Sequence, residues 1–137
     1  MFTKIHHIGI AVQDLQHSLT IYRDLLGLEL AETHEVAEQK VRTALFPLGD
    51  TQIELIQPTA GNVGVTKFLA TRGEGVHHLC FEVADLELAL QTLKDRGAVL
   101  IDESPRLLDG GKKKMAFVHP KSTGGVLIEL YQLCEER

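Results

Sequence analysis

The ten residues His77-His78-Leu79-Cys80-Phe81-Glu82-Val83-Ala84-Asp85-Leu86 repeat an earlier stretch of the same chain, His6-His7-Ile8-Gly9-Ile10-Ala11-Val12-Gln13-Asp14-Leu15. The histidine pair, the valine, the aspartate and the leucine recur in register. In both copies an apolar run with strand character leads to an aspartate, a residue type that often caps the start of a helix. This self-similarity predicts a fold built from two copies of one small unit.

Each copy leads into a helix whose apolar side chains recur at helical spacing, so that one face of the helix is expected to lie on a core. These side chains are Leu15, Leu19, Tyr22 and Leu26 in the first copy and Leu86, Ala89, Leu90 and Leu93 in the second. Gly27 and Gly97 follow the two helices and are placed to end them in a left-handed turn.

Three strands are predicted after each helix. They cover 28–36, 41–48 and 51–57 in the first copy and 98–101, 114–119 and 125–132 in the second, with a strand over 4–12 at the start and a short helix over 65–72 between the copies. The chain is therefore predicted to be α+β, a tandem duplication of a β-α-β-β-β unit forming a curved mixed sheet. We expect one domain over 4–133, with repeats at about 4–58 and 75–133, because neither unit could bury its sheet alone.

Length and composition narrow the range of functions. The 137 residues carry a net charge of −5, which gives no support to nucleic-acid binding. Two cysteines, Cys80 and Cys134, form no C-x-x-C pair, so neither a disulfide framework nor a zinc knuckle is expected. No secretory signal and no membrane-spanning run are recognisable, and the predicted location is the cytoplasm.

The last strand of each copy carries one carboxylate in an apolar run, as Ile53-Glu54-Leu55 and Ile128-Glu129-Leu130. A carboxylate is seldom buried without a partner. If the two copies are related by pseudo-twofold symmetry, these glutamates can converge with one histidine from each histidine pair. Two imidazoles and two carboxylates suit a divalent Co, Mn, Ni, Zn or Fe ion. The alternative is a set of structural histidines and a solvent-facing Glu54, but the match between the repeats favours ligands.

These motifs resemble the vicinal oxygen chelate family, which includes glyoxalase I, extradiol dioxygenases and antibiotic-resistance proteins. The resemblance runs from Lys4 to Leu133. Within the family, the stretch from His119 to Leu130 is most similar to the methylmalonyl-CoA epimerases. By motif position the resemblance implies a divalent cofactor (Co, Mn, Ni or Zn) held by the second histidine of each pair and by both glutamates. The implied metal ligands are His7, Glu54, His78 and Glu129, and His6 and His77 are left to packing.

The implied reaction interconverts the (R) and (S) forms of methylmalonyl-CoA by removing a proton from one face of C2 and delivering one to the other. Such chemistry needs two acid/base groups on opposite sides of an enolate, and the resemblance assigns them to Glu129 and Glu54. The sequence departs from the epimerase pattern at two positions that bear on this assignment. Several epimerases have a glutamine where Glu54 stands and a separate glutamate at the position of Thr43. Either Glu54 does more here, or another group supplies the second proton.

An acyl-CoA substrate needs cations for its phosphates and donors for its acyl group. The lysine run Lys112, Lys113 and Lys114 is the main candidate, and Arg106 and Lys121 can add to it. The hydroxyls of Ser122 and Thr123 and the glycine turn after them can hold a carboxylate or carbonyl. The alternative reading of the lysine run is a solvated turn.

Other functions of the same family stay open at this point. A glyoxalase I-type lyase acting on a hemithioacetal would use the same four ligands, and a drug-binding relative without catalysis would need none of them. An extradiol dioxygenase is disfavoured because it needs only three ligands, in a longer chain. A homodimer is expected by family analogy, with neither nucleic acid nor membrane as a partner.

Overall fold

The computed structural model describes residues 1–134, which form two compact units. The first unit comprises His7–His77. The second unit comprises 78–134 together with Met1–His6. The boundaries between the units fall within β1 (Phe2–Ala11) and β5 (Gly75–Val83), so each of these strands contributes to both units.

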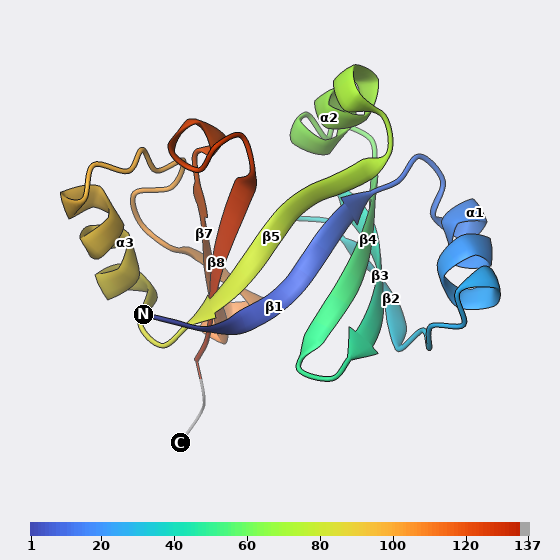
Figure 1. Cartoon of the computed structure of the whole chain (residues 1–137), viewed down its shortest axis with the longest axis horizontal. Coiled ribbons are helices and arrows are strands. Elements are labelled where there is room, and N and C mark those ends of the chain that lie inside the picture. The colour runs from blue at the N-terminus through green and yellow to red at the C-terminus, as the bar shows by residue number, and fades with distance from the viewer. Residues whose placement is uncertain (135–137) are drawn as a thin grey trace. The chain divides into compact units, whose positions relative to one another are not determined.

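The first unit follows the predicted β-α-β-β-β order. After β1 come α1 (Leu15–Leu19), the π-helical η1 (Thr20–Leu25), β2 (Glu32–Val36), β3 (Val41–Leu48), β4 (Thr51–Pro58) and α2 (Gly64–Arg72). The strand order is β2-β3-β4-β1. Strand β3 runs antiparallel to β2 and β4, whereas β4 runs parallel to β1. Helix α1 lies against β3 and β4 (Figure 1).

The second unit repeats this arrangement. After β5 come α3 (Leu86–Asp95), β6 (Arg106–Leu108), the 3-10 turn η2 (Asp109–Gly111), β7 (Lys113–Val118), the 3-10 turn η3 (Pro120–Ser122) and β8 (Leu127–Leu133). The strand order is β1-β5-β8-β7-β6. Strand β5 runs parallel to β8, and β8 runs antiparallel to β7. Helix α3 lies against β7 and β8 (Figure 1). The predicted α+β class, the mixed strand directions and the duplication are confirmed.

One helix covers one sheet face in each unit, and its predicted apolar stripe supplies the helix side of a core whose remaining residues come mostly from the strands. Asp14 and Asp85 cap α1 and α3 by accepting hydrogen bonds from backbone N–H groups of the first turn, as predicted. The buried residues are Val12, Leu15, Leu19, Ala44, Phe46 and Leu55 under α1, and Val83, Leu86, Ala89, Leu90, Ala116, Val118 and Leu130 under α3. We call these the helix-covered faces. The other face of each sheet is the inner face.

A glutamine at the end of the last strand joins that strand to the helix in both units. The side-chain Oε1 of Gln57 accepts a hydrogen bond from the backbone N–H of Leu15 at 2.8 Å. Gln132 accepts from the N–H of Leu86, also at 2.8 Å. The first-turn N–H groups of a helix lack intrahelical acceptors, so each glutamine satisfies a donor that the fold would otherwise bury.

One of the apolar side chains predicted to lie on the core, Leu26, is 58% exposed. The N–H of Leu26 donates to the carbonyl of Ile21, five residues earlier, at 2.9 Å. This π-helical turn holds more residues than an α-helical turn. The wider turn rotates Leu26 away from the core, so the prediction that this leucine is buried is wrong.

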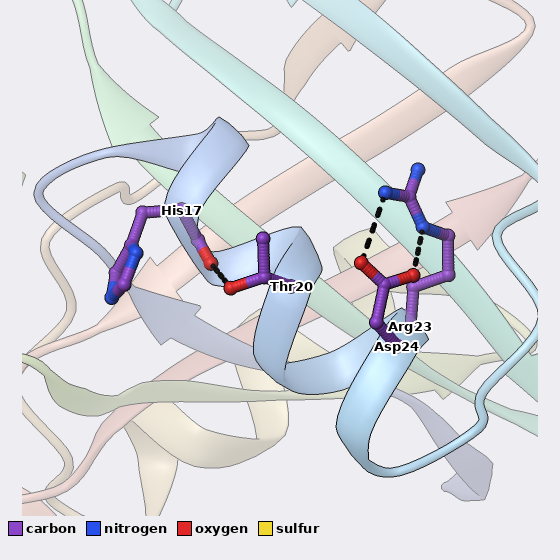
Figure 2. Close-up of polar contacts among 4 residues, drawn as sticks. All are labelled: His17, Thr20, Arg23 and Asp24. Carbon is purple, nitrogen blue, oxygen red and sulfur yellow. Dashed lines mark hydrogen bonds and ion pairs between the residues drawn. The ribbon is translucent and has the colours of Figure 1, made fainter.

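Figure 2 shows the polar contacts made along α1 and η1 by His17, Thr20, Arg23 and Asp24. Thr20 Oγ1 donates to the carbonyl of His17 at 2.6 Å. Arg23 Nε donates to Asp24 Oδ1 at 2.9 Å, and this hydrogen bond, together with the positive charge of Arg23, holds the pKa of Asp24 below its ordinary value. Both side chains of this pair are about half exposed, so solvent screening keeps their contribution to stability small.

Two of the predicted strands differ from the structure. Residues 28–31 lie outside β2, and 98–101 form no strand. In the latter segment only Leu100 makes an isolated bridge, to Val118, while the Val99 N–H donates to the side chain of Ser122. The short edge strand β6 takes the predicted strand's place beside β7, and its three residues are too few to show an alternating pattern. None of the helices in residues 1–134 has the length and apolar character needed to span a bilayer.

Candidate functional site

The inner face of the first unit brings His7 and Glu54 together. Strand β4 pairs in parallel with β1 so that Glu54 lies beside Gly9, two residues beyond His7. Residues two apart on a strand point to the same face, so both side chains project inward. His7 Nε2 lies 3.6 Å from Glu54 Oε1. The His7 side chain is 7% exposed and that of Glu54 is 20% exposed, which makes this a largely buried imidazole–carboxylate pair.

The inner face of the second unit holds His78 and Glu129 in the same register. Glu129 lies beside Cys80, two residues beyond His78. His78 Nε2 lies 3.1 Å from Glu129 Oε1, with side chains that are 5% and 10% exposed. The ring of Phe117 stands perpendicular to the His78 ring, with 6.3 Å between their centroids. This second pair is shorter and more deeply buried than the pair in the first unit.

The two pairs have the chemistry of a divalent-metal site. Each offers one imidazole Nε2 and one carboxylate oxygen, which are borderline-to-hard ligands suited to Zn, Co, Mn or Ni. Burying an acidic side chain is costly without a compensating partner. The predicted ligand types therefore lie close together within each unit, and the residues present fit a divalent ion.

The first histidine of each pair makes an aromatic contact. The His6 ring lies 4.5 Å from the ring of Tyr131, measured between centroids, and His77 lies edge-on to Phe68 at 5.0 Å. These contacts match the packing role expected of His6 and His77. No sequence motif points to Tyr131, although its position two residues after Glu129 places it on the same inner face. Burial raises the pKa of its hydroxyl above the ordinary value for tyrosine.

Thr43 is buried on the inner face of the first unit. It is 5% exposed and lies on β3 two residues from Leu45, the residue that pairs with Glu54. The alternation of side chains along β3 places the Thr43 hydroxyl on the face that carries Glu54. The position at which several epimerases have a glutamate is therefore directed toward the site here, but it carries no carboxylate.

The hydroxyls predicted to bind substrate take part in the structure of their own loop. Ser122 Oγ accepts a hydrogen bond from the N–H of Val99 at 2.8 Å. Thr123 Oγ1 donates to the carbonyl of Val126. The loop leads into Leu127, which pairs with His78, so the end of the loop lies beside the His78–Glu129 pair. The two hydroxyls therefore help to fix the conformation of the loop backbone beside that pair.

The three consecutive lysines do not share one face. Lys113 pairs with Leu133, and the alternation along β7 places it on the inner face with Phe117 and Glu129. Lys114 projects to the helix-covered face, where its Nζ bonds Glu87 Oε1 at 2.9 Å. That hydrogen bond raises the pKa of Lys114. Lys112 and Lys121 belong to turns beside β7 and β8. The structure therefore separates Lys114 from Lys113.

Comparisons with known proteins agree with the family resemblance. The model of the Glyoxalase/Bleomycin resistance protein/Dioxygenase superfamily matches residues 6–117. The uncharacterized protein YqjC of Bacillus subtilis is 40% identical over 134 residues, which cover 98% of this chain and 93% of YqjC. The mitochondrial methylmalonyl-CoA epimerase of Dictyostelium discoideum is 36% identical over 128 residues, which cover 93% of this chain and 76% of that protein.

A solved structure extends the likeness to three dimensions. A variant of Streptomyces coelicolor methylmalonyl-CoA epimerase, in complex with 2-nitronate-propionyl-CoA, superposes with a TM-score of 0.87 and 35% identity. The alignment covers 98% of this chain and 100% of that structure. Since the family model matches most of the chain, the protein belongs to the Glyoxalase/Bleomycin resistance protein/Dioxygenase superfamily.

Proposed function

We propose that this protein is a metal-dependent epimerase that interconverts the (R) and (S) forms of methylmalonyl-CoA by 1,1-proton transfer. The observation that carries the proposal is the pairing of one buried imidazole with one carboxylate at the same register in both units, at 3.6 Å and 3.1 Å. Relatives named methylmalonyl-CoA epimerase, at 32–36% identity, support the substrate and place the activity among the isomerases.

His7, Glu54, His78 and Glu129 are proposed to hold one divalent ion (Co, Mn, Ni or Zn). When bound, the ion would act as a Lewis acid that stabilises negative charge on the oxygens of the substrate. The support for a single shared site is the duplication, which supplies matching donors from each unit, together with the family to which the chain belongs. The histidines provide neutral donors, and the two glutamates balance the charge of the ion.

Glu129 and Glu54 are the proposed acid/base pair. The C2 proton lies between a thioester and a carboxylate, so the carbanion formed by its removal is delocalised. One glutamate removes this proton, and the other delivers a proton to the opposite face of C2. Thr43 has no acid/base function at neutral pH. The acid/base role in the first unit is therefore assigned to Glu54, which lies on the same inner face. Each proton transfer of this kind contributes roughly 100- to 10,000-fold in rate.

Lys112, Lys113 and Lys121 are the proposed partners of the CoA phosphates, and the loop containing Ser122 and Thr123 is the proposed partner of the acyl group. The inward direction of Lys113 and the proximity of the loop to His78 support these assignments. Lys114 carries the same charge but projects to the opposite face, where its Nζ bonds Glu87.

The test is a coupled assay with a mutase that accepts only one methylmalonyl-CoA epimer. The single epimer that the mutase rejects is supplied, so that turnover requires its interconversion by this protein. Turnover proportional to the amount of protein would support the epimerase. If the protein does not turn over the epimer but acts on a hemithioacetal, the epimerase proposal is wrong and the protein is a glyoxalase I-type lyase.

A homodimer is part of the same proposal and rests on family analogy. Its test is the mass in solution from light scattering coupled to size-exclusion chromatography. A mass of twice 15.2 kDa is expected, and a mass of 15.2 kDa would contradict the dimer.

A further inference from the structure

Asp102 is anchored in the second unit through both of its carboxylate oxygens. Oδ2 accepts a hydrogen bond from the backbone N–H of Phe117 at 2.9 Å. Oδ1 accepts from Arg106 Nε at 2.8 Å. The Asp102 side chain is 13% exposed. Because one oxygen is bound to the backbone of β7, the other presents a fixed negative charge to Arg106.

The Arg106 guanidinium is oriented by two contacts. Asp102 binds its Nε, and its Cζ lies over the ring of Phe117, 5.6 Å from the centroid. A guanidinium at this distance is attracted to the ring face. The side chain is 49% exposed, and its hydrogen bond to Asp102 uses Nε rather than a terminal amino group. Arg106 is thus a pre-oriented cation whose outer edge faces solvent.

Phe117 connects this cation to the candidate site. It pairs directly with Glu129 between β7 and β8, and its ring stands 6.3 Å from that of His78. The guanidinium lies on a ring that itself contacts the His78–Glu129 pair.

We propose that Arg106 is a substrate-binding residue whose terminal amino groups bind two oxygens of one anionic group of the substrate. This inference rests on the proposed function, because it assigns a contact to that same substrate. The planar guanidinium fork matches a carboxylate or a phosphate in a bidentate way that lysine cannot reproduce. Methylmalonyl-CoA offers both groups, namely the carboxylate on C2 and the phosphates of CoA. Asp102 is the positioning residue that holds the fork.

Two probes separate the two sources of the anion. Free CoA carries the phosphates without the acyl carboxylate, and malonyl-N-acetylcysteamine thioester carries the carboxylate without the phosphates. Binding of each probe would be measured by titration calorimetry in Mn-containing buffer, for the wild-type protein, Arg106→Gln and Arg106→Lys. Arg42→Gln is the matched control, because Arg42 is 47% exposed and also pairs with one acidic residue, Glu35.

Loss of a charge-assisted bidentate contact is expected to weaken binding of one probe by about tenfold or more. Weaker CoA binding by Arg106→Gln would identify the phosphates, and weaker thioester binding would identify the carboxylate. Arg106→Lys should also lose affinity, since it keeps the charge but not the fork, whereas Arg42→Gln should match wild type.

Two results would overturn the inference: unchanged affinity of Arg106→Gln for both probes, or no binding of either probe by wild type. Failure of the proposed function has a different signature. If wild type fails to epimerise methylmalonyl-CoA but Arg106→Gln still loses affinity for one probe, the proposed epimerase function is wrong. The anion-binding role of Arg106 would then still hold. Epimerisation by wild type with unchanged probe binding by Arg106→Gln would remove only the role of Arg106.

Discussion

Glu129 Oε1 lies 3.1 Å from Nε2 of His78, and the two side chains are 10% and 5% exposed. Little of this carboxylate reaches water, so its charge must be balanced by the groups around it. The pairing follows from the register of β5 and β8, which places Glu129 two residues beyond the histidine on the same face. This relationship connects the fold to the proposed chemistry, because a buried carboxylate beside an imidazole nitrogen is suited both to bind a metal and to exchange a proton.

Replacing Glu129 with glutamine should lower epimerase turnover by at least roughly 100-fold, because the amide cannot accept the C2 proton. Turnover would be measured in the mutase-coupled assay, with the metal content of the variant determined in parallel. Glu87→Gln is the control, since Glu87 lies on α3 on the helix-covered face and bonds Lys114. Full activity of a metal-loaded Glu129→Gln would contradict the assignment.

Replacing Glu54 with glutamine should separate exchange from epimerisation. With Glu129 intact, one face of C2 still has a base, so one epimer should exchange its C2 proton with solvent deuterium. Interconversion of the epimers should fall by at least roughly 100-fold, because the opposite face has lost its acid. NMR of each pure epimer in deuterated water measures both rates. Equal loss or equal retention of the two rates would mean that Glu54 is not the second acid/base group.

Gln132→Ala should destabilise the second unit by about 1–3 kcal/mol, since the buried N–H of Leu86 would lose its acceptor. Gln57→Ala should have a similar effect through Leu15, because the two hydrogen bonds have the same length. Urea denaturation measures the free energy of unfolding. Gln91→Ala, which removes only an exposed side-chain contact with Asp95, should stay within about 0.5 kcal/mol of wild type. A Gln132→Ala variant as stable as Gln91→Ala would argue against this role.

Lys113→Gln and Lys114→Gln should differ although the two residues are neighbours. Lys113 shares the inner face with Glu129, so its loss should raise the KM for methylmalonyl-CoA about threefold to tenfold, as expected for one exposed phosphate contact. Lys114 bonds Glu87 on the other face, so its loss should leave KM unchanged. Steady-state kinetics of both variants decide the matter. A raised KM for Lys114→Gln alone would restore the substrate role that the sequence predicts for it.

The repeat predicted the parts of the site that depend on strand register. The repeat matched Glu54 with Glu129 and one histidine pair with the other, and the family resemblance selected the second histidine of each pair, His7 and His78. The period of two residues along a strand explains why each selected histidine shares a face with its glutamate. Equivalent residues in two copies of a unit then have equivalent surroundings. The same rule applied along β7 separates Lys113 from Lys114, but the sequence shows a run of three lysines without showing where the strand begins.

The features that the sequence did not reveal depend on contacts between distant segments. The π-helical turn that exposes Leu26 is a local choice between two hydrogen-bonding patterns, and the apolar spacing is compatible with both. The edge strand β6 is too short to show alternation. The orientation of Arg106 by Asp102 and Phe117 arises only once β6 and β7 are paired.

The most direct test of the central claim is exchange of the C2 proton of methylmalonyl-CoA in deuterated water, before and after metal removal. The protein would be dialysed against EDTA, assayed by NMR, and assayed again after reloading with Co or Mn. We predict that exchange and interconversion of the epimers are lost on metal removal and restored on reloading. A metal-loaded protein that exchanges no C2 proton, or a metal-free protein that epimerises at the same rate, would contradict a metal-dependent methylmalonyl-CoA epimerase.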